Sequence, residues 1–325
     1  MQHTRPAVVV ITGASSGIGQ ATAMAFARHG ARLVLAARGR SSLERIAEDC
    51  RGLGAEAMVV KTDVTDPTAV QHLAQQALAY GEIDVWVSNV GVGAVGKFHE
   101  TPIEAHQQVI NASLIGHMND AHAVIPIFLR QGHGIFINMI SLGGFAAAPF
   151  AAAYSAAKFG LRGFSEALRA ELADKPDIHI CDVYPAFVDT PGLAHGANYM
   201  GKRVTAPPPL IDPREVAAAI LDITRSPRPT TTVGLVTNAS RLAHLLAPNL
   251  SARVLARFMS AYFRRAEVVA RSDGNLFRPP AEAGGIDGGL RSDKRLVERP
   301  VAIALLTIGM MAVGTVMAHR LKRRT

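Results

Sequence analysis

Tyr154 and Lys158 lie four residues apart, and their side-chain types could together move a proton. A tyrosine near its ordinary pKa of about 10 is a poor base at neutral pH, so its anion needs stabilisation. On a helix, the fourth residue along lies on the same face, and the Lys158 ammonium is therefore expected to favour the phenolate of Tyr154. The pair predicts proton transfer at a substrate oxygen; the alternative is a half-buried tyrosine beside a solvated lysine.

A glycine-rich segment near the start of the chain predicts a site for a dinucleotide. The short β-branched run at residues 7–11 suits a strand buried on both faces of a parallel sheet, and Thr-Gly-Ala-Ser-Ser-Gly-Ile-Gly follows it. Gly13 allows a tight turn, Gly17 leaves room for a pyrophosphate, and Gly19 lets the next helix pack closely. That helix, expected over residues 18–29, directs free N–H groups at the phosphates. The predicted cofactor contacts here are Thr12, Gly13, Ser15, Ser16, Gly17, Ile18 and Gly19.

Two single residues complete a recognisable pattern. Ser141 lies thirteen residues before Tyr154, at the end of the apolar run 134–140, and Asn111 lies in an expected helix. With Thr-Gly-x-x-x-Gly-x-Gly and Tyr-x-x-x-Lys, the chain resembles the short-chain dehydrogenases/reductases of the common NAD(P)-dependent type over about residues 7–236. The resemblance implies a doubly wound Rossmann fold and an oxidoreductase that transfers hydride.

The resemblance also implies roles for individual residues. Tyr154 would act as general acid or base, Ser141 would hold the substrate oxygen, and Asn111 would anchor a water that relays protons. Lys158 would in addition bind the nicotinamide ribose. The further cofactor contacts that it implies are Asp63, Val64, Asn89, Gly91, Tyr154, Lys158, Pro185, Val188 and Thr190.

The chain departs from the family pattern at two places near the cofactor. Val90 stands beside the adenosine where the family usually has a small alanine, which predicts a slightly altered fit. Ala186 stands where a glycine usually follows the proline, which predicts a changed local turn. Val188 and Thr190 remain suited to gripping the carboxamide of the nicotinamide.

The end of the second expected strand bears on cofactor choice. In NAD-preferring members an acidic residue there accepts hydrogen bonds from the ribose 2′-hydroxyl and repels a 2′-phosphate. Here the strand at residues 32–37 ends without an acid and runs into Arg38 and Arg40. An arginine suits a phosphate through its planar fork of donors, so NADP(H) is the predicted cofactor, with NAD(H) possible and Arg38 as the contact. The alternative is a solvated loop arginine.

Apolar runs alternate with helical stretches, which predicts an α/β fold with a doubly wound parallel sheet. Strands are expected near residues 7, 31, 57, 83, 134 and 177 and at 231–236, and helices over 67–80, 103–130 and 153–174. Residues 192–213 are expected to form a lid over the substrate, or else a plain irregular connection. The predicted organisation is a Rossmann catalytic domain at 1–240, an amphipathic helical extension at 241–272, an irregular linker at 273–299, a transmembrane helix at 300–319 and a basic tail at 320–325.

The C-terminal extension predicts attachment to a membrane. Residues 301–318 contain no charge and would span about 27 Å as a helix, close to the hydrocarbon core of about 30 Å. The alternative is a buried helix of a soluble dimer, and basic residues on both flanks leave the orientation open. Upstream, Leu250, Val254, Phe258 and Tyr262 recur every four residues, with Arg253 and Arg257 among them. This helix is expected either to lie on an anionic membrane surface or to pack on the catalytic domain near the substrate entrance.

The net charge and the cysteine count indicate which kinds of partner and site to expect. The net charge of +8 comes with many basic residues beside the apolar tail and with no motif for nucleic acid, so membrane lipid is the expected partner. The two cysteines, Cys50 and Cys181, indicate neither a disulfide framework nor a metal site. No secretory signal precedes the first strand, and the catalytic domain is therefore expected to face the cytosol.

The sequence as a whole predicts an NADP(H)-dependent oxidoreductase that interconverts a carbonyl and a secondary alcohol. Membrane attachment suggests a lipophilic small-molecule substrate, and the family resemblance implies a homo-oligomer, either a dimer or a tetramer. One alternative is a non-catalytic nucleotide-binding scaffold or redox sensor on the same fold. Another is an epimerase or dehydratase that consumes no cofactor.

Overall fold

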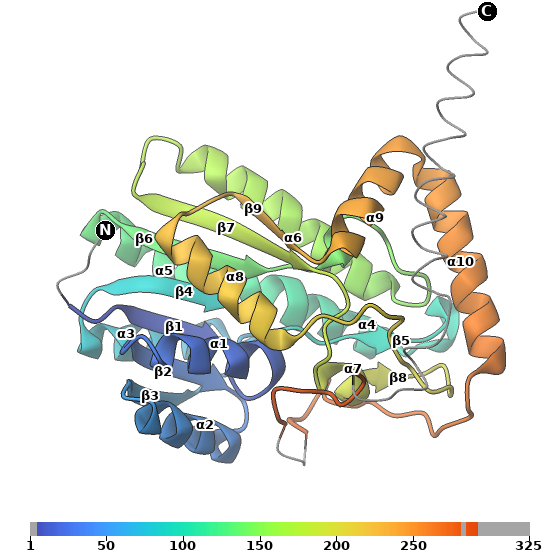
Figure 1. Ribbon diagram of the computed structural model, residues 1–325, viewed down its shortest axis with the longest axis horizontal. Coiled ribbons are helices and arrows are strands. Elements are labelled where there is room, and N and C mark those ends of the chain that lie inside the picture. Colours follow the sequence, from blue (N-terminus) through green and yellow to red (C-terminus); the bar gives the residue numbers. More distant parts are fainter. Residues whose placement is uncertain (1–4, 281–283, 292–325) are drawn as a thin grey trace, which may run out of the picture.

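A seven-stranded parallel sheet lies at the centre of the computed structural model, which describes residues 5–280 and 284–291 (Figure 1). Its order is β3-β2-β1-β4-β6-β7-β9, and every neighbouring pair is parallel. The strands are β1 Val8–Thr12, β2 Arg32–Ala37, β3 Glu56–Lys61, β4 Ile83–Ser88, β6 Gly134–Met139, β7 Ile178–Pro185 and β9 Thr230–Val233. This order confirms the predicted Rossmann-like doubly wound fold.

Helices cover both faces of the sheet, as right-handed crossovers between parallel strands require. One face carries α1 Gly17–Ala27, α2 Arg40–Gly52 and α8 Pro213–Arg225, and the other carries α3 Pro67–Ala77, α4 Ile103–Ile110, α5 Gly116–Gln131 and α6 Ala152–Glu171 (Figure 1). Every residue of β1 and β4 is buried, because a strand between two helical layers has no solvent face. The uniform apolar runs in the sequence follow from this burial.

The helix expected over residues 103–130 is interrupted. One π-helical turn, Asn111–Ile115, separates α4 from α5. Such a turn changes which side chains point to the core on either side of it, and π-helical turns occur frequently at functional sites. Here it lies beside the loop that follows β4, because the buried Ser113 of this turn bonds to the backbone of Val92.

The segment expected to be a lid, residues 192–213, carries short elements of its own. It contains α7 Gly192–His195 and the short strand β8 Ala197–Asn198, which pairs with β5 Ala94–Val95. The following stretch, 203–207, lines the main cavity of the protein. This segment therefore covers the cavity, as the lid hypothesis requires.

The helical extension is a pair of helices, α9 Leu235–Leu246 and α10 Pro248–Arg265, which begins before the predicted boundary at 241 (Figure 1). The side chain of Phe263 is buried and contacts the ring of Phe150 at a centroid distance of 5.5 Å. Of the two readings of α10, the structure therefore supports packing on the catalytic domain.

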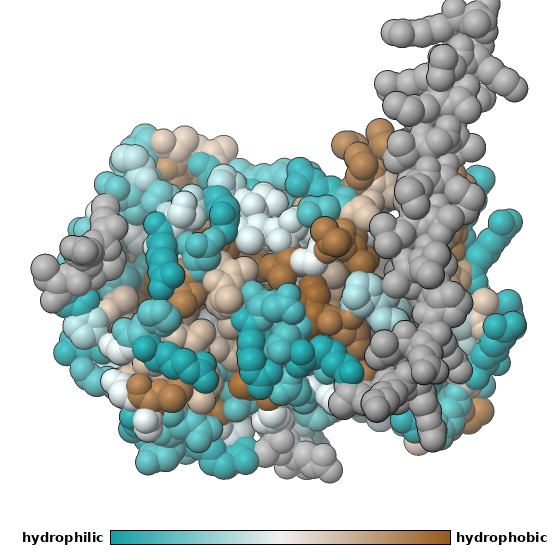
Figure 2. Space-filling view, in the orientation of Figure 1, coloured by the Kyte–Doolittle hydropathy of each residue, from teal (hydrophilic) through white to brown (hydrophobic). Residues whose placement is uncertain are grey.

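Apolar side chains remain exposed on α9, where Figure 2 shows brown surface. They include Leu235, Leu242 and Leu245. None of the helices in the described ranges is long and apolar enough to cross a bilayer. The predicted span at 300–319 and the basic tail lie outside those ranges.

Candidate active site

A cavity of about 1190 Å³ opens at the carboxyl ends of the central strands. Residues within two positions of the strand ends line it: Gly13 after β1, Arg38 after β2, Asn89 after β4 and Ser141 after β6. In doubly wound sheets, ligands bind at this edge where the strand order reverses, and here β1 has β2 on one side and β4 on the other. The cavity therefore lies where a dinucleotide is expected.

The structure brings nearly all of the predicted site residues to this cavity. Its lining includes Gly13, Ser15, Ser16, Gly17, Ile18, Arg38, Asp63, Val64, Asn89, Gly91, Ser141, Tyr154, Lys158, Pro185, Val188 and Thr190. Thr12 and Gly19 lie behind the lining and hold the glycine-rich loop in shape. Asn111 also lies outside the lining, and its side chain is exposed.

The geometry of the glycine-rich loop fits a pyrophosphate. Gly13 and Gly17 have φ angles of +66° and +54°, and a Cβ on Gly19 would lie 2.1 Å from the carbonyl oxygen of Gly13. Side chains at these positions would therefore open the loop. The amide of Asn89 donates to the carbonyl oxygens of Thr12 and Gly13 at 3.3 and 3.1 Å. The loop is thereby fixed at the start of α1, where backbone N–H groups bind anions.

The far end of the cavity presents donors to a nucleotide. Arg38 lines it together with Ser41, Ser42 and Arg45. The guanidinium of Arg38 also donates to the backbone carbonyls of Leu276 and Asn275, at 3.0 and 2.5 Å. Arg38 is therefore held in place by the C-terminal part of the chain, a contact that the sequence reading did not foresee.

Ser141, Tyr154 and Lys158 meet at the other end of the cavity. Ser141 follows β6 with a φ of 142°, a backbone conformation that is strained for any residue but glycine and that recurs at active sites. Its hydroxyl accepts a hydrogen bond from the Gly143 N–H at 3.1 Å. Tyr154 and Lys158 lie one turn apart on α6, with the Lys158 ammonium 5.8 Å from the centre of the Tyr154 ring.

Burial dominates the electrostatics of this pair. It raises the pKa of Tyr154 above its ordinary value, against a hydrogen bond with Ser141 that lowers it. Burial also lowers the pKa of Lys158 to about 7. The lysine ammonium donates to the carbonyl oxygen of Met139 at 2.9 Å. Burial thus favours a neutral phenol that can donate a proton, and the charge of Lys158 is not among the causes of this shift.

The structure places Ser113, and not the predicted Asn111, against the loop that lines the cavity. Asn111 is exposed on the π-helical turn and does not line the cavity. Ser113 is fully buried: its hydroxyl donates to the carbonyl oxygen of Val92 at 2.9 Å and accepts from the Val92 N–H at 3.1 Å. Ser113 thus ties the turn to the loop that lines the cavity. The signal in the sequence was the spacing of buried positions, since Ser113 falls four residues after Val109 and Asn111 does not.

A buried carboxyl supports the glycine-rich loop from below. Asp120, on α5, accepts hydrogen bonds from the hydroxyls of Ser88 at 2.6 Å and Thr12 at 2.9 Å. The Thr12 oxygen in turn accepts from the Asn89 N–H. Burial raises the pKa of Asp120 to about 7. The carboxyl joins the ends of β1 and β4, and the sequence reading had not singled it out.

His117 is a second buried polar residue behind the cavity. Its Nε2 donates to the carbonyl oxygen of Val90 at 2.7 Å, and its Nδ1 lies 2.5 Å from the Oδ1 of Asn138. Asn138 donates onward to Ser165 on α6. Burial, and to a lesser degree the charge of Lys158, lowers the pKa of His117 to about 3. A neutral imidazole has a single N–H and can donate to only one of these two oxygens; with the proton on Nε2 it bonds to Val90 in the loop that lines the cavity.

An apolar wall completes the cavity beyond Tyr154. It is built largely by α10 and the loop after β6, with Leu255, Phe258, Met259, Phe263, Ala148 and Pro149 among its lining residues. These side chains offer contact to carbon and few hydrogen bonds. This end of the cavity suits the apolar part of a small molecule.

Comparison with known proteins agrees with this geometry. A profile described as short chain dehydrogenase matches residues 7–198. An uncharacterized oxidoreductase of Bacillus subtilis, YxnA, is 29% identical over 324 residues, which cover 96% of this chain and 91% of that protein.

Two solved structures show the same fold. A short-chain dehydrogenase/reductase from Burkholderia phymatum in complex with NAD has a TM-score of 0.67 at 26% identity, covering 75% of this chain and 95% of that one. A variant of the actinorhodin polyketide ketoreductase with NADPH has a TM-score of 0.64 at 29% identity, covering 72% of this chain and 97% of that one. The chain belongs to the short-chain dehydrogenase family and is an NAD(P)-dependent oxidoreductase.

Proposed function

We propose that the protein is an NADP(H)-dependent reductase that converts a lipophilic ketone to the secondary alcohol, and that it can run the reverse reaction. The observation that carries this proposal is the neutral Tyr154 phenol beside Ser141 and Lys158, at the end of a cavity whose other end is the glycine-rich loop. A buried phenol is a proton donor, which is what a carbonyl oxygen needs as it becomes an alcohol.

The residues divide the work of the reaction among them. The glycine-rich loop, Asp63 and Val64 would hold the adenine and pyrophosphate of the cofactor, and Val188 and Thr190 the nicotinamide end. Bound NADPH supplies the hydride. Ser141 holds the substrate oxygen by a hydrogen bond, and Tyr154 donates the proton to that oxygen. Lys158, with its lowered pKa of about 7, can then return a proton to Tyr154 and take up a new proton from solvent.

The first experiment is a titration of the purified full chain with NADPH and NADH, followed by a panel of ketones in the same cuvette. Binding of NADPH with ketone-dependent oxidation supports the proposal. Binding without oxidation of the nucleotide by any ketone or alcohol favours the scaffold reading, and absence of binding of both nucleotides overturns the proposal.

Arg38 is proposed to select the phosphorylated cofactor. Replacing Arg38 with glutamine should raise the KM for NADPH by about tenfold or more and change that for NADH little, since a charged hydrogen bond contributes about 1.5–3 kcal/mol. The matched control is Arg40→Gln, because Arg40 pairs with Glu44 on the surface and lies outside the cavity lining. Equal effects of Arg38→Gln on both nucleotides would refute this role.

The apolar wall is proposed to select lipophilic substrates. Phe258→Ala should raise the KM for a long-chain ketone severalfold through lost apolar contact of about 1–3 kcal/mol, and leave acetone turnover near that of the wild type. Steady-state rates with a series of ketones of increasing chain length measure this. If small hydrophilic ketones are turned over well and lipophilic ones are not, the substrate class is wrong.

Membrane attachment is proposed from residues 301–318 and their basic flanks. The apolar residues exposed on α9 are consistent with a nearby lipid surface. Sedimentation of the full chain with anionic and neutral vesicles tests this, and a protein that stays in the supernatant with both kinds overturns it.

A further inference from the structure

Residues 284–291, called the strap here, lie beside the nucleotide site and contact both the glycine-rich loop and the loop after β7. At one end the carbonyl oxygen of Gly285 accepts a hydrogen bond from the Gly17 N–H at 2.9 Å, in the glycine-rich loop. At the other end the Gly288 N–H donates to the carbonyl oxygen of Asp189 at 3.1 Å, beside Thr190. The strap thus joins the two walls between which a pyrophosphate would lie.

The strap lies in close contact with both walls. A Cβ on Gly284 would lie 2.5 Å from the Cβ of Ser16, and one on Gly288 would lie 2.6 Å from the Thr190 carbonyl oxygen. Contacts this short leave no room for a side chain at either glycine. The sequence of the strap is therefore fitted to this position.

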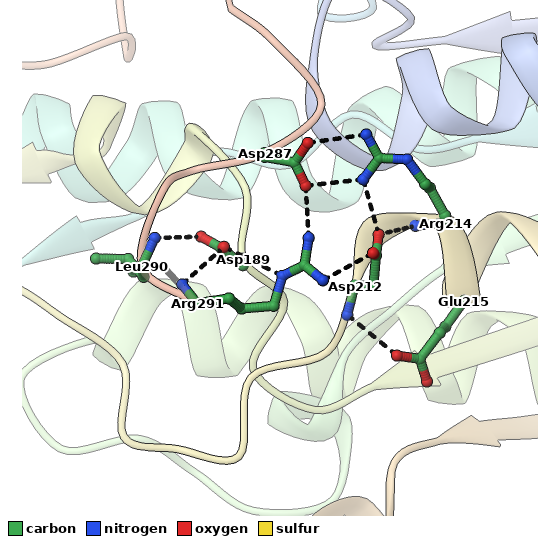
Figure 3. A network of polar contacts seen from close by, with 7 residues as sticks. All are labelled: Asp189, Asp212, Arg214, Glu215, Asp287, Leu290 and Arg291. Carbon is green, nitrogen blue, oxygen red and sulfur yellow. Dashed lines mark hydrogen bonds and ion pairs between the residues drawn. The ribbon is translucent and has the colours of Figure 1, made fainter. Parts of the chain in front are cut away.

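A network of ion pairs fastens the C-terminal end of the strap (Figure 3). The Asp189 carboxylate is buried, and it accepts hydrogen bonds from the Leu290 N–H at 2.9 Å and the Arg291 N–H at 3.0 Å. The Arg291 guanidinium reaches Asp189 at 3.2 Å and Asp212, the N-cap of α8, at 2.7 Å. The strap thereby supplies both backbone and side-chain donors to one buried carboxylate, which holds it firmly.

Asp287 carries a second attachment to the domain. Its carboxylate receives both guanidinium nitrogens of Arg214 at 2.8 Å, on α8. This bidentate bond holds the pKa of Asp287 below its ordinary value, so the attachment persists at neutral pH. Two arginines and three carboxylates therefore connect the strap to the loop after β7 and to the start of α8.

The strap covers the nucleotide cavity and does not fill it. Gly284, Gly288 and Leu290 line the same cavity as Gly13 and Tyr154, and its volume of about 1190 Å³ exists with the strap in place. A segment that imitated the cofactor would occupy this space. The strap instead leaves room beneath it and forms part of the wall of the cavity.

We propose that the strap is a gate that must detach from the glycine-rich loop and from Asp189 before the nicotinamide nucleotide can enter or leave. The inference rests on the proposed function, because it presumes that the cavity binds NADPH. Asp189 adjoins Val188 and Thr190, and docking of the strap therefore also fixes the loop that would grip the nicotinamide.

Two variants detach the strap in different ways. Arg291→Gln removes the ion pairs to Asp189, Asp212 and Asp287, and Gly288→Ala forces a methyl group against the Thr190 backbone. Stopped-flow displacement of fluorescent NADPH by excess NADP⁺ measures the release rate. Each variant should release NADPH at least about tenfold faster than the wild type, the change that about 1.4 kcal/mol produces.

Matched controls separate strap release from general damage. A Cβ on Gly285 meets nothing within 4 Å and the alanine keeps the carbonyl, so Gly285→Ala should release NADPH as the wild type does. Arg130→Gln removes an arginine in the last turn of α5, outside the cavity lining.

The outcomes distinguish the strap from the proposed function. Unchanged release in both Arg291→Gln and Gly288→Ala overturns the gate, as does tighter NADPH binding in both, which would mean that the strap competes with the nucleotide. Wild-type protein that binds neither NADPH nor NADH overturns the proposed function, and the gate with it.

Discussion

Tyr154→Phe should lower kcat for ketone reduction by about 10²- to 10⁴-fold, the range that a positioned general acid contributes. Phenylalanine keeps the buried ring and removes only the hydroxyl that bonds with Ser141. Substrate and nucleotide contacts should persist, while the proton for the substrate oxygen loses its source. The measurement is the initial rate of NADPH oxidation at saturating ketone, with NADPH binding titrated in the same preparation.

Tyr80→Phe is the matched control for the tyrosine prediction. Tyr80 is only partly buried, outside the cavity lining, and its contact with Arg32 is made through its backbone carbonyl. This variant should keep wild-type kcat. If Tyr154→Phe also keeps the wild-type kcat, and the wild type turns over ketones readily, Tyr154 is not the proton donor. If neither wild type nor variant turns over any substrate but both bind NADPH, the scaffold reading gains support.

The nucleotide half of the site was predictable because local backbone constraints decide it. A buried strand followed by a turn with Gly13 and Gly17 at positive φ can be built by very few sequences, and the glycine spacing records the constraint directly. The Tyr154 and Lys158 pair was predictable for a similar reason, since a helix brings residues four apart to one face. Such local rules survive whatever packs around them.

The electrostatics of that pair were not predictable, because burial is a property of the whole fold. The sequence places a lysine one turn from Tyr154, and proximity of charge predicts a lowered tyrosine pKa. The structure directs the Lys158 ammonium at the Met139 carbonyl and buries the phenol, so desolvation prevails and the pKa of Tyr154 rises. Which of two opposing effects prevails depends on the surrounding atoms.

Long-range contacts account for the other differences. The assignment of Asn111 came from the family resemblance, whereas the π-helical turn at residues 111–115 leaves that side chain exposed and Ser113 buried. Residues 273–299 read as a linker because they are rich in glycine and proline. The structure shows that Gly284 packs against the side chain of Ser16 and Gly288 against the backbone of Thr190, so these two positions require glycine. Composition alone cannot distinguish glycines that permit flexibility from glycines that permit close packing.

His117→Phe should destabilise the protein at about pH 7.5 by about 1–3 kcal/mol, because the buried carbonyl of Val90 loses its donor. The deficit should shrink as the pH falls. Burial keeps His117 neutral in the folded state, with its pKa lowered from 6.5 to about 3. Below about pH 6.5 the unfolded wild type therefore binds more protons than the folded one. The free energy of unfolding of the wild type consequently decreases as the pH decreases.

The size of this effect follows from the pKa difference. Between about pH 6.5 and about pH 5, the wild type loses about 2 kcal/mol through His117, at 1.36 kcal/mol per unit, and the phenylalanine variant does not. Asp120, whose pKa is raised to about 7, titrates in both proteins and cancels in the difference to the extent that the substitution leaves its surroundings intact. Urea unfolding of the wild type and of the phenylalanine variant, at about pH 7.5 and at about pH 5, gives each free energy of unfolding by linear extrapolation.

His117→Gln separates the hydrogen bonds from the titration. Glutamine has a donor and an acceptor but no proton to gain near pH 6, so its deficit at about pH 7.5 should be smaller than that of phenylalanine. The change in deficit between about pH 7.5 and about pH 5 should nevertheless be the same for both variants, because it belongs to the wild-type histidine. A deficit that stays constant with pH in both variants would mean that the pKa of His117 in the folded protein equals that in the unfolded chain, so that the folded protein takes up a proton at His117 between these pH values. The network joining Val90 to Asn138 and Ser165 would then have to carry a buried charge beside Lys158, against the repulsion that its position imposes.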